Sequence, residues 1–305
     1  MSFILGLNTY HPDSSACILK NGVLIAATEE ERFNRIKHWS GLPIQSINYC
    51  LTHAKIKFSD LDYIAINTNP YNILFFKFIL FFTFRPNITF ILKKLLTKSK
   101  KINLINTIQK SYPNDKFHGE LINVDHHLSH LSSVYYYSNY EKSVVLSVDG
   151  FGDLASTAWG FAKNNKISID KKILFPHSLG IFYQAITQFL GFNNYGDEYK
   201  VMGLSSYGDP TYIEEMKKLV SFESDGSFKL NLFYFRHHLN KIDFTKEDGV
   251  PIYDNLYSNN LINLLGEPRK KSDAITERHK NIAASLQLMY ENALFNILNL
   301  SLIHI

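Results

Sequence analysis

Apolar runs of strand length alternate with turn residues along the first part of the chain. The pair Asn21-Gly22 separates two of these runs and predicts a hairpin, because both residues tolerate a positive φ angle. A helical spacing of apolar residues follows Pro43, a residue suited to the start of a helix. Residues 1–70 are therefore predicted to form a β-β-β-α-β unit. Its strands are predicted at residues 3–8, 14–20, 23–29 and 61–68.

A similar alternation returns after residue 118. A helical pattern covers residues 178–192, where Ser178 is suited to the N-cap position, and a longer one covers residues 273–300. The polar stretch 213–272 is predicted to be irregular. Together these elements predict an α/β fold with mixed sheets and helices packed against them. The further strands are predicted at residues 119–125, 143–150, 156–162 and 166–175. The apolar side of the long helix is predicted at Ile282, Leu286, Met289 and Ala293.

One apolar segment, residues 71–96, raises the question of a membrane span. Lys77 and Arg85 interrupt it and Pro86 breaks it, so its uncharged runs are shorter than the ~20 residues that a span needs. The segment is predicted to form apolar helices that pack on the domain, and a position at a membrane interface is left open. No membrane span is expected.

Composition narrows the classes of function. The formal net charge is +4 over 305 residues, with the basic residues scattered, which argues against a nucleic-acid-binding surface. Cys17 and Cys50 are the two cysteines and have no CxxC spacing, so neither a disulfide framework nor a zinc-cysteine site is supported. The N-terminus lacks a basic n-region and a long apolar run, and a cytoplasmic location is expected.

Three histidines open the predicted helix after residue 125. His126 and His130 are four residues apart and share one helix face, so they can bind one divalent metal, whereas His127 points elsewhere. The alternative is a helix cap and surface histidines. The pair follows a predicted strand, and sites of α/β proteins are built at the carboxyl ends of strands.

An acidic residue ends the next apolar run. Asp149 is followed by Gly150 and Gly152, a sequence suited to a metal-phosphate site, because glycine lets backbone N–H groups approach an anion while the carboxylate holds a cation. An ordinary Asp-Gly hairpin turn is the alternative interpretation.

These motifs resemble those of the nodulation/cephalosporin-type O-carbamoyltransferase family. The resemblance begins with HHLSHLSSVYY and LSVDGFGD, which are similar to the metal and phosphate motifs of that family. Other similar segments follow in the family's order over residues 4–291. They are GLNTYHPDSSACILKNG (6–22), EEERFNRIKHW (29–39), SLGIFYQAITQFLGF (178–192), DEYKVMGLSSYGDP (197–210) and NIAASLQLMYE (281–291).

The resemblance implies a fold and a reaction. The family belongs to the actin-like ATPase superfold, related to ribonuclease H, whose duplicated β-β-β-α-β lobes clamp a nucleotide. Its members cleave carbamoyl phosphate, join the carbamoyl group to ATP as carbamoyl-adenylate, and pass it to a hydroxyl of a small-molecule acceptor, usually a sugar or an antibiotic. The cofactors implied are ATP and a divalent metal, for which iron, manganese and zinc all fit nitrogen and oxygen ligands.

The resemblance also implies roles for individual residues. His126 and His130 match the metal-binding histidines, with Asp149 as their acidic partner. Lys37 matches a lysine near the carbamoyl group, where an ammonium would neutralise phosphate oxygens; a solvated surface charge is the alternative. His11 is expected at the mouth of the cleft as a catalytic group, although Pro12 separates it from the aspartate that it directly precedes in some relatives. The residues expected to contact phosphates are Ser14, Ser15, Gly150, Gly152 and Lys200, and a surface ion pair with Glu198 is the alternative for the last of them.

Family members are considerably longer than this chain. The family's second lobe, with a Gly-Gly nucleotide segment and a further metal-binding aspartate, is not in the sequence. We therefore expect one incomplete N-terminal domain that self-associates or binds a second-lobe partner, and no carbamoyl transfer by the chain alone. The alternative to an O-carbamoyltransferase is a non-catalytic metal- or nucleotide-binding remnant, or half of a split enzyme. A hydrogenase-maturation module is disfavoured because its zinc-finger cysteines are absent. The predicted segments are 1–70 (first unit), 71–117 (apolar helical insertion), 118–212 (metal and phosphate motifs), 213–272 (variable insertion) and 273–305 (connecting helix).

Overall fold

The computed structural model describes residues 1–69, 104–239, 249–252 and 254–303. The chain divides into two compact units, Met1–His126 with Phe244–Pro251, and His127–Asp243 with Ile252–Ile305. The predicted insertion 71–117 lies mostly outside the described residues. Among the described helices, none has the length and apolar character needed to cross a bilayer.

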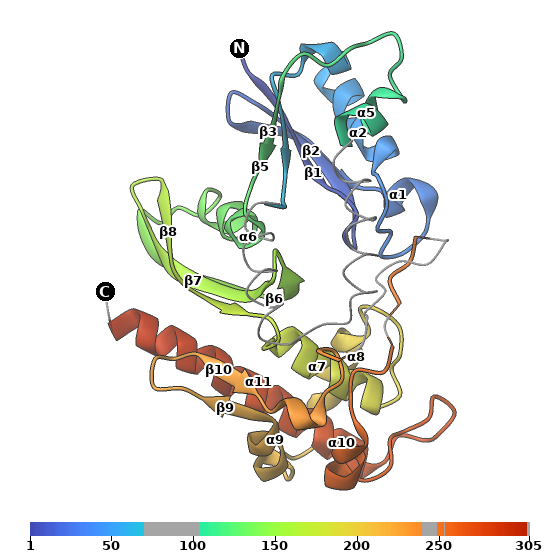
Figure 1. Cartoon of the computed structure of the whole chain (residues 1–305), viewed down its shortest axis with the longest axis vertical. Helices are drawn as coiled ribbons and strands as arrows, with labels where there is room; N and C mark the ends of the chain where they lie inside the picture. The colour runs from blue at the N-terminus through green and yellow to red at the C-terminus, as the bar shows by residue number, and fades with distance from the viewer. Residues whose placement is uncertain (70–103, 240–248, 253, 304–305) are drawn as a thin grey trace. The chain divides into compact units, whose positions relative to one another are not determined.

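A five-stranded mixed sheet forms the centre of the first unit (Figure 1). Its order is β3-β2-β1-β4-β5, with β1, β2 and β3 antiparallel and β1, β4 and β5 parallel. Asn21 and Gly22 both have positive φ angles, as the predicted hairpin requires. The sheet confirms the α/β class and the β-β-β-α-β unit expected of the actin-like superfold. The strands are β1 (Phe3–Asn8), β2 (Ser15–Lys20), β3 (Val23–Glu29), β4 (Tyr63–Ile66) and β5 (Glu120–Asn123).

Helix α2 covers strands β2 and β3 with its apolar face. Ile47 and Cys50 of this helix are fully buried, together with Leu5 and Ile18 of the sheet. Part of the core of the first unit therefore lies between α2 and the sheet, as the helical spacing after Pro43 predicted, and Phe58, Leu104 and Ile108 add to it. The helices of this unit are α1 (Glu31–Asn34), α2 (Ile44–Ala54), the short 3-10 helix η1 (Phe58–Asp60) and α5 (Leu104–Gln109).

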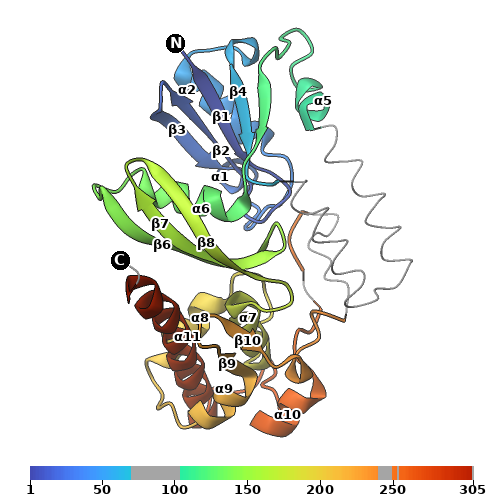
Figure 2. The same cartoon turned by 60° about the vertical axis from the view of Figure 1, so that its left-hand side comes forward.

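The second unit contains an antiparallel sheet in the order β6-β7-β8. Helix α6 (His126–Tyr135) lies against this sheet (Figure 2). Leu131 and Tyr135 of α6 are buried in one cluster with Val145 and Ala162 of the sheet. Packing against β6 thus holds the histidine helix beside the strand that carries Asp149. The strands are β6 (Lys142–Gly152), β7 (Ala155–Lys163) and β8 (Lys166–Leu174).

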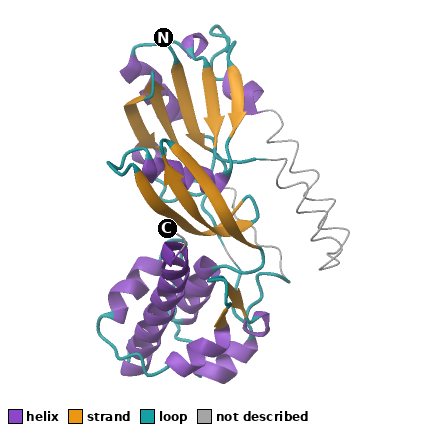
Figure 3. Ribbon diagram, turned by 90° about the vertical axis from the view of Figure 1, so that its left-hand side faces the viewer, coloured by secondary structure: helices purple, strands orange, loops and turns teal. Residues whose placement is uncertain are grey.

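Helices surround a larger core in the same unit (Figure 3). The hydroxyl of Ser178 accepts a hydrogen bond from the Ile181 N–H and caps α7, as predicted. The predicted apolar side of the long helix is buried too, at Ile282, Leu286, Met289 and Ala293. The three longest helices in this layer are α7 (Leu179–Phe189), α8 (Glu198–Ser205) and α11 (Glu277–Ile303).

The prediction that residues 213–272 are irregular is wrong where the structure describes them. Phe228 and Leu261 are buried in the core of the second unit. The apolar residues of this stretch fall in short separate runs, each too short to make a long periodic pattern, and several of them pack inward from a short element. These elements are α9 (Ile213–Leu219), β9 (Val220–Phe222), β10 (Phe228–Leu230), the 3-10 helix η2 (Leu232–Tyr234) and α10 (Asn259–Leu265).

Candidate metal centre

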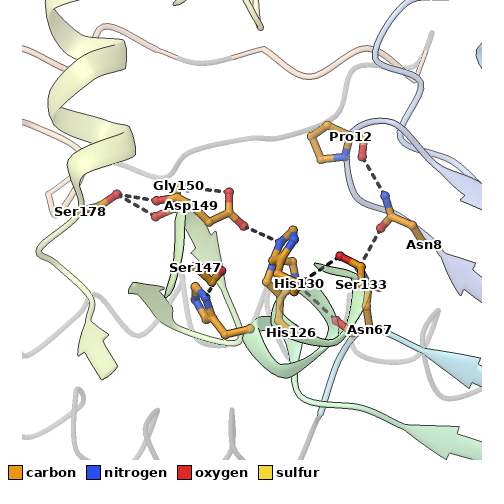
Figure 4. A network of polar contacts seen from close by, with 11 residues as sticks. Asn8, Pro12, Asn67, His126, His130, Ser133, Ser147, Asp149, Gly150 and Ser178 are labelled. Carbon is orange, nitrogen blue, oxygen red and sulfur yellow. Dashed lines mark hydrogen bonds and ion pairs between the residues drawn. The ribbon is translucent and has the colours of Figure 1, made fainter. Parts of the chain in front are cut away.

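Helix α6 and strand β6 bring the three predicted metal ligands together. The candidate ligand atoms of His126, His130 and Asp149 all lie within 4.8 Å of one another. His130 Nε2 is 3.5 Å from Asp149 Oδ2. The two imidazoles share one helix face because they are one turn apart, and Figure 4 shows the Asp149 carboxylate directed at His130. We name this cluster of His126, His130 and Asp149 the metal triad.

The triad is closed on one side and open on the other. His126 is only 5% exposed, whereas the side chains of His130 and Asp149 are 51% and 37% exposed. His127 is fully buried, and its Nδ1 lies 2.9 Å from the hydroxyl of Ser147 on β6. The third histidine therefore faces the sheet, as expected, and a ligand can reach the triad from solvent.

The end of β6 holds the carboxylate in a defined orientation. The Gly150 N–H donates to Asp149 Oδ1 at 2.6 Å, which leaves Oδ2 on the side of His130. The hydroxyl of Ser178 lies 3.1 Å and 2.8 Å from the carbonyl oxygens of Asp149 and Gly150. Because Ser178 also caps α7, one side chain connects the first turn of that helix to the Asp149 turn.

Gly180 allows α7 to approach this turn closely. A Cβ atom at residue 180 would lie 2.7 Å from the carbonyl oxygen of Asp149 and 2.9 Å from two backbone atoms of Gly150. Real Cβ contacts of that length with backbone are not tolerated, so the approach requires glycine.

Aromatic side chains pack behind the turn. Phe151 lies 5.3 Å from Phe175 and 6.3 Å from His237, measured between ring centroids. His237 Nε2 donates to the carbonyl of Pro176 at 2.7 Å. Burial lowers the pKa of His237 to about 4, so the ring is neutral at pH 7 and behaves as part of an aromatic cluster.

The loop after β1 carries His11, whose ring centroid lies 5.5 Å from that of His126. His126 Nδ1 is 3.3 Å from the carbonyl oxygen of Asn67. Tyr10 and Asp13 flank His11 with φ angles of 58° and 57°, values that non-glycine residues adopt at a cost. The His11 ring thus lies beside His126 despite the intervening Pro12.

The other predicted residues of the first unit have varied surroundings. Ser14 is fully buried, and its hydroxyl lies 2.9 Å from the carbonyl oxygens of both His11 and Gly41. Ser15 opens β2 opposite Asn8. Lys37 is exposed. The serine hydroxyl therefore braces the His11 loop, and the phosphate contacts expected of Ser14, Ser15 and Lys37 stay predictions.

In the second unit, Gly150 has open space where a Cβ atom would lie, while its N–H is bonded to Asp149 Oδ1. Gly152 is paired with Ala155 across the β6–β7 hairpin. The ammonium of Lys200 is 2.5 Å from Asp197, so its ion-pair partner is Asp197 and not Glu198.

Sequence reasoning missed four residues that organise this site, namely Asn8, Asn67, Ser178 as a support of Asp149, and Gly180. The sequence identifies Ser178 only as a helix cap. The position of Asn8 at the end of a predicted strand was the available signal, since polar residues at strand ends build α/β sites. No local pattern indicates that Gly180 meets the turn of Asp149.

Comparison with known proteins places these observations in a family. The sequence profile described as "Carbamoyltransferase N-terminus" matches residues 3–303. The chain is 33% identical to uncharacterized protein sll1178 of Synechocystis, over 98% of the chain and 48% of that protein. It is 31% identical to nodulation protein NolNO of Sinorhizobium fredii, over 95% of the chain and 38% of that protein.

The chain thus spans less than half the length of these two relatives. Among solved structures, the Ppx/GppA phosphatase of Aquifex aeolicus aligns with 99% of the chain and 93% of its own, at 11% identity and a TM-score of 0.35. The family match over nearly the whole chain agrees with the motifs from which the triad is built. The chain is a member of the carbamoyltransferase family and corresponds to the N-terminal domain of that family.

Proposed function

We propose that this chain is the N-terminal part of an O-carbamoyltransferase that uses carbamoyl phosphate and ATP. The observation that carries the proposal is the convergence of His126, His130 and Asp149 on one point. In the proposed reaction, water cleaves carbamoyl phosphate to carbamate and phosphate, and a carbamate oxygen then attacks the α-phosphorus of ATP and displaces pyrophosphate, which gives carbamoyl-adenylate. The hydroxyl of a sugar- or antibiotic-like acceptor then attacks the carbamoyl carbon, and AMP leaves.

The donor set of the triad fits a divalent metal. Two imidazole nitrogens and one carboxylate oxygen suit Fe²⁺, Mn²⁺ or Zn²⁺. Ligand atoms within 4.8 Å of one another need to close by only a few tenths of an ångström to share one ion, because two bonds of ~2.0–2.2 Å span at most ~4.4 Å. A bound ion would supply Lewis-acid stabilisation of charge on phosphoryl or carbamoyl oxygens.

The remaining residues would act on substrate. His11, beside His126, is proposed to move a proton at the carbamoyl or phosphate group. The exposed ammonium of Lys37 is proposed to neutralise phosphate oxygens as charge develops. The open space beside Gly150 is proposed to admit a phosphate group, whose oxygens would compete with Asp149 Oδ1 for the Gly150 N–H.

Metal analysis of purified variants tests the triad. We expect His126→Ala and His130→Ala to lose most of the Mn²⁺ or Fe²⁺ that the wild-type chain retains after dialysis. His127→Ala should keep it, because His127 faces Ser147, and so should His118→Ala, an exposed histidine. Equal metal content in wild type and His126→Ala would remove the basis of the proposal.

A second candidate is a metal- or nucleotide-binding module without transfer activity. The observation in its favour is that all three candidate metal ligands come from helix α6 and strand β6, so a metal could bind without any transfer step. Incubation with ATP, carbamoyl phosphate and Mn²⁺, followed by mass spectrometry for carbamoyl-adenylate, separates the two. Turnover by a monodisperse monomer supports the enzyme, and nucleotide binding without turnover supports the module.

A further inference from the structure

The side chain of Asn8 connects the His11 loop to the residue that orients His126. Asn8 Nδ2 donates to the carbonyl oxygens of Pro12 at 3.0 Å and Asp13 at 3.1 Å. Asn8 Oδ1 accepts from Asn67 Nδ2 at 3.1 Å (Figure 4). Both amide hydrogens and the amide oxygen of Asn8 are thus engaged.

The two asparagines meet because of strand pairing. In the parallel pair β1–β4, Leu7 lies opposite Ile66, so Asn8 and Asn67 are the next residues at the carboxyl ends of the two strands. This is the sheet edge at which sites of α/β folds are built.

On one side, Asn8 restrains a strained loop. Tyr10 and Asp13 have left-handed φ angles, and such residues persist only where their surroundings hold them. The bond from Asn8 to the Asp13 carbonyl, together with the Ser14 hydroxyl near the His11 carbonyl, provides that restraint around His11.

On the other side, Asn67 orients His126. The main-chain carbonyl oxygen of Asn67 lies 3.3 Å from His126 Nδ1. Since a carbonyl can only accept, a neutral ring carries its proton on Nδ1 and its lone pair on Nε2. Metal-binding histidines commonly donate their second ring nitrogen in this way, which fixes the tautomer and the ring orientation.

We propose that Asn8 is a positioning residue of the triad, acting through Asn67 to hold His126 in the Nδ1–H tautomer with His11 beside it. The proposal rests on the proposed function in that His126 serves as a metal ligand. It assigns to Asn8 no contact with metal or substrate.

Asn8→Asp in the full chain is the first test. The substitution places an oxygen opposite the carbonyls of Pro12 and Asp13, at 3.0 and 3.1 Å, while the acceptor for Asn67 is preserved. We expect Mn²⁺ affinity, measured by calorimetric titration, to fall about tenfold. A new carboxylate acting by charge alone would raise the affinity for a cation, so the sign separates the two effects. Asn8→Ala, which adds no charge, should weaken binding as well.

Asn34→Asp is the matched control. It adds the same charge in the same unit, and the Asn34 side-chain oxygen accepts from the Ile36 N–H at 2.8 Å, a bond that aspartate retains. Its Mn²⁺ affinity should stay within about twofold of wild type. If Asn8→Asp fails to fold, Asn67→Asp repeats the test, because it opposes two oxygens across the Asn8–Asn67 contact and preserves both loop bonds.

Ring spectra of the histidines give a readout that needs neither metal nor activity. In long-range ¹H–¹⁵N spectra of the metal-free chain, His126 should be protonated on Nδ1, and Asn8→Asp should shift the His11 and His126 ring signals without moving those of His118. An Nε2–H tautomer in wild type, or Asn8 variants with unchanged Mn²⁺ affinity and unchanged ring signals, would overturn the proposal. If wild type binds no Mn²⁺, the proposed metal function fails, while the ring spectra still decide the role of Asn8.

Discussion

Gly180→Ala should destabilise the protein, although alanine is the better helix former. The new methyl group would lie 2.7 Å from the Asp149 carbonyl oxygen and 2.9 Å from the Cα and N atoms of Gly150. All three are backbone atoms, so no side chain can rotate away. Every residue of α7 except Gly180 is buried, which prevents the helix from moving without disturbing the core.

The magnitude follows from two opposing effects. Replacing glycine by alanine inside a helix is worth about 0.5–1 kcal/mol in favour of the variant, and less in the first turn. Overpacking against fixed atoms costs about 1–3 kcal/mol. The steric overlap outweighs the gain in helix propensity, and we expect a net loss of about 1–2 kcal/mol in the free energy of unfolding.

Urea unfolding followed by circular dichroism measures this difference, with Gly203→Ala as the matched control. Gly203 is an exposed residue inside α8, and nothing lies within 4 Å of a Cβ atom there. Alanine at residue 203 should therefore raise the free energy of unfolding by about 0.5–1 kcal/mol. Opposite signs are expected for the two variants. A Gly180→Ala protein as stable as wild type would refute the inferred contact between α7 and the Asp149 turn.

Two further predictions concern buried ionisable groups. Because burial lowers the pKa of His237 from 6.5 to about 4, the unfolded chain binds more protons between these values, and stability should fall by about 3 kcal/mol as the pH drops through this range. Between pH 7 and pH 4.5, the free energy of unfolding in urea should fall less for His237→Phe than for wild type. An equal fall in the two proteins would contradict the lowered pKa of His237. Glu30 is 4% exposed and accepts hydrogen bonds from the Gln45 N–H, the Ser46 N–H and the Ser46 hydroxyl in the first turn of α2, at 2.8–3.1 Å. Glu30→Gln should therefore lower the urea midpoint of unfolding and the free energy of unfolding by about 2 kcal/mol. Glu29→Gln, which removes only a half-exposed 3.6 Å pair with Arg32, should cost under about 0.5 kcal/mol, and an equal loss in both variants would contradict the stabilising role of the hydrogen bonds to Glu30.

Local chemistry determined much of the first unit. The length of the apolar runs, the Asn21-Gly22 turn and the helical spacing after Pro43 each act within a few residues of sequence, and the strands and α2 form where these signals lie. The spacing of His126 and His130 is local in the same sense, because helix geometry alone puts them on one face.

Long-range packing decided what local signals could not. The described part of residues 213–272 contains short strands and helices, and their buried apolar residues pack in one core with those of α7 and α11. The partner of Lys200 was likewise set by the turn that brings Asp197 within 2.5 Å, and not by the neighbouring Glu198.

The candidate site divides in the same way. The sequence by itself determined which residues can bind a metal and phosphates, since that depends on side-chain chemistry and on spacing within one helix or one strand end. Only the tertiary structure decided which residues support them. Strand pairing places Asn8 beside Asn67 across 59 residues of sequence, and helix packing places Gly180 against the Asp149 turn. Both contacts depend on the register of a sheet or the depth of a helix in its core, and neither quantity is encoded in any short stretch of the chain.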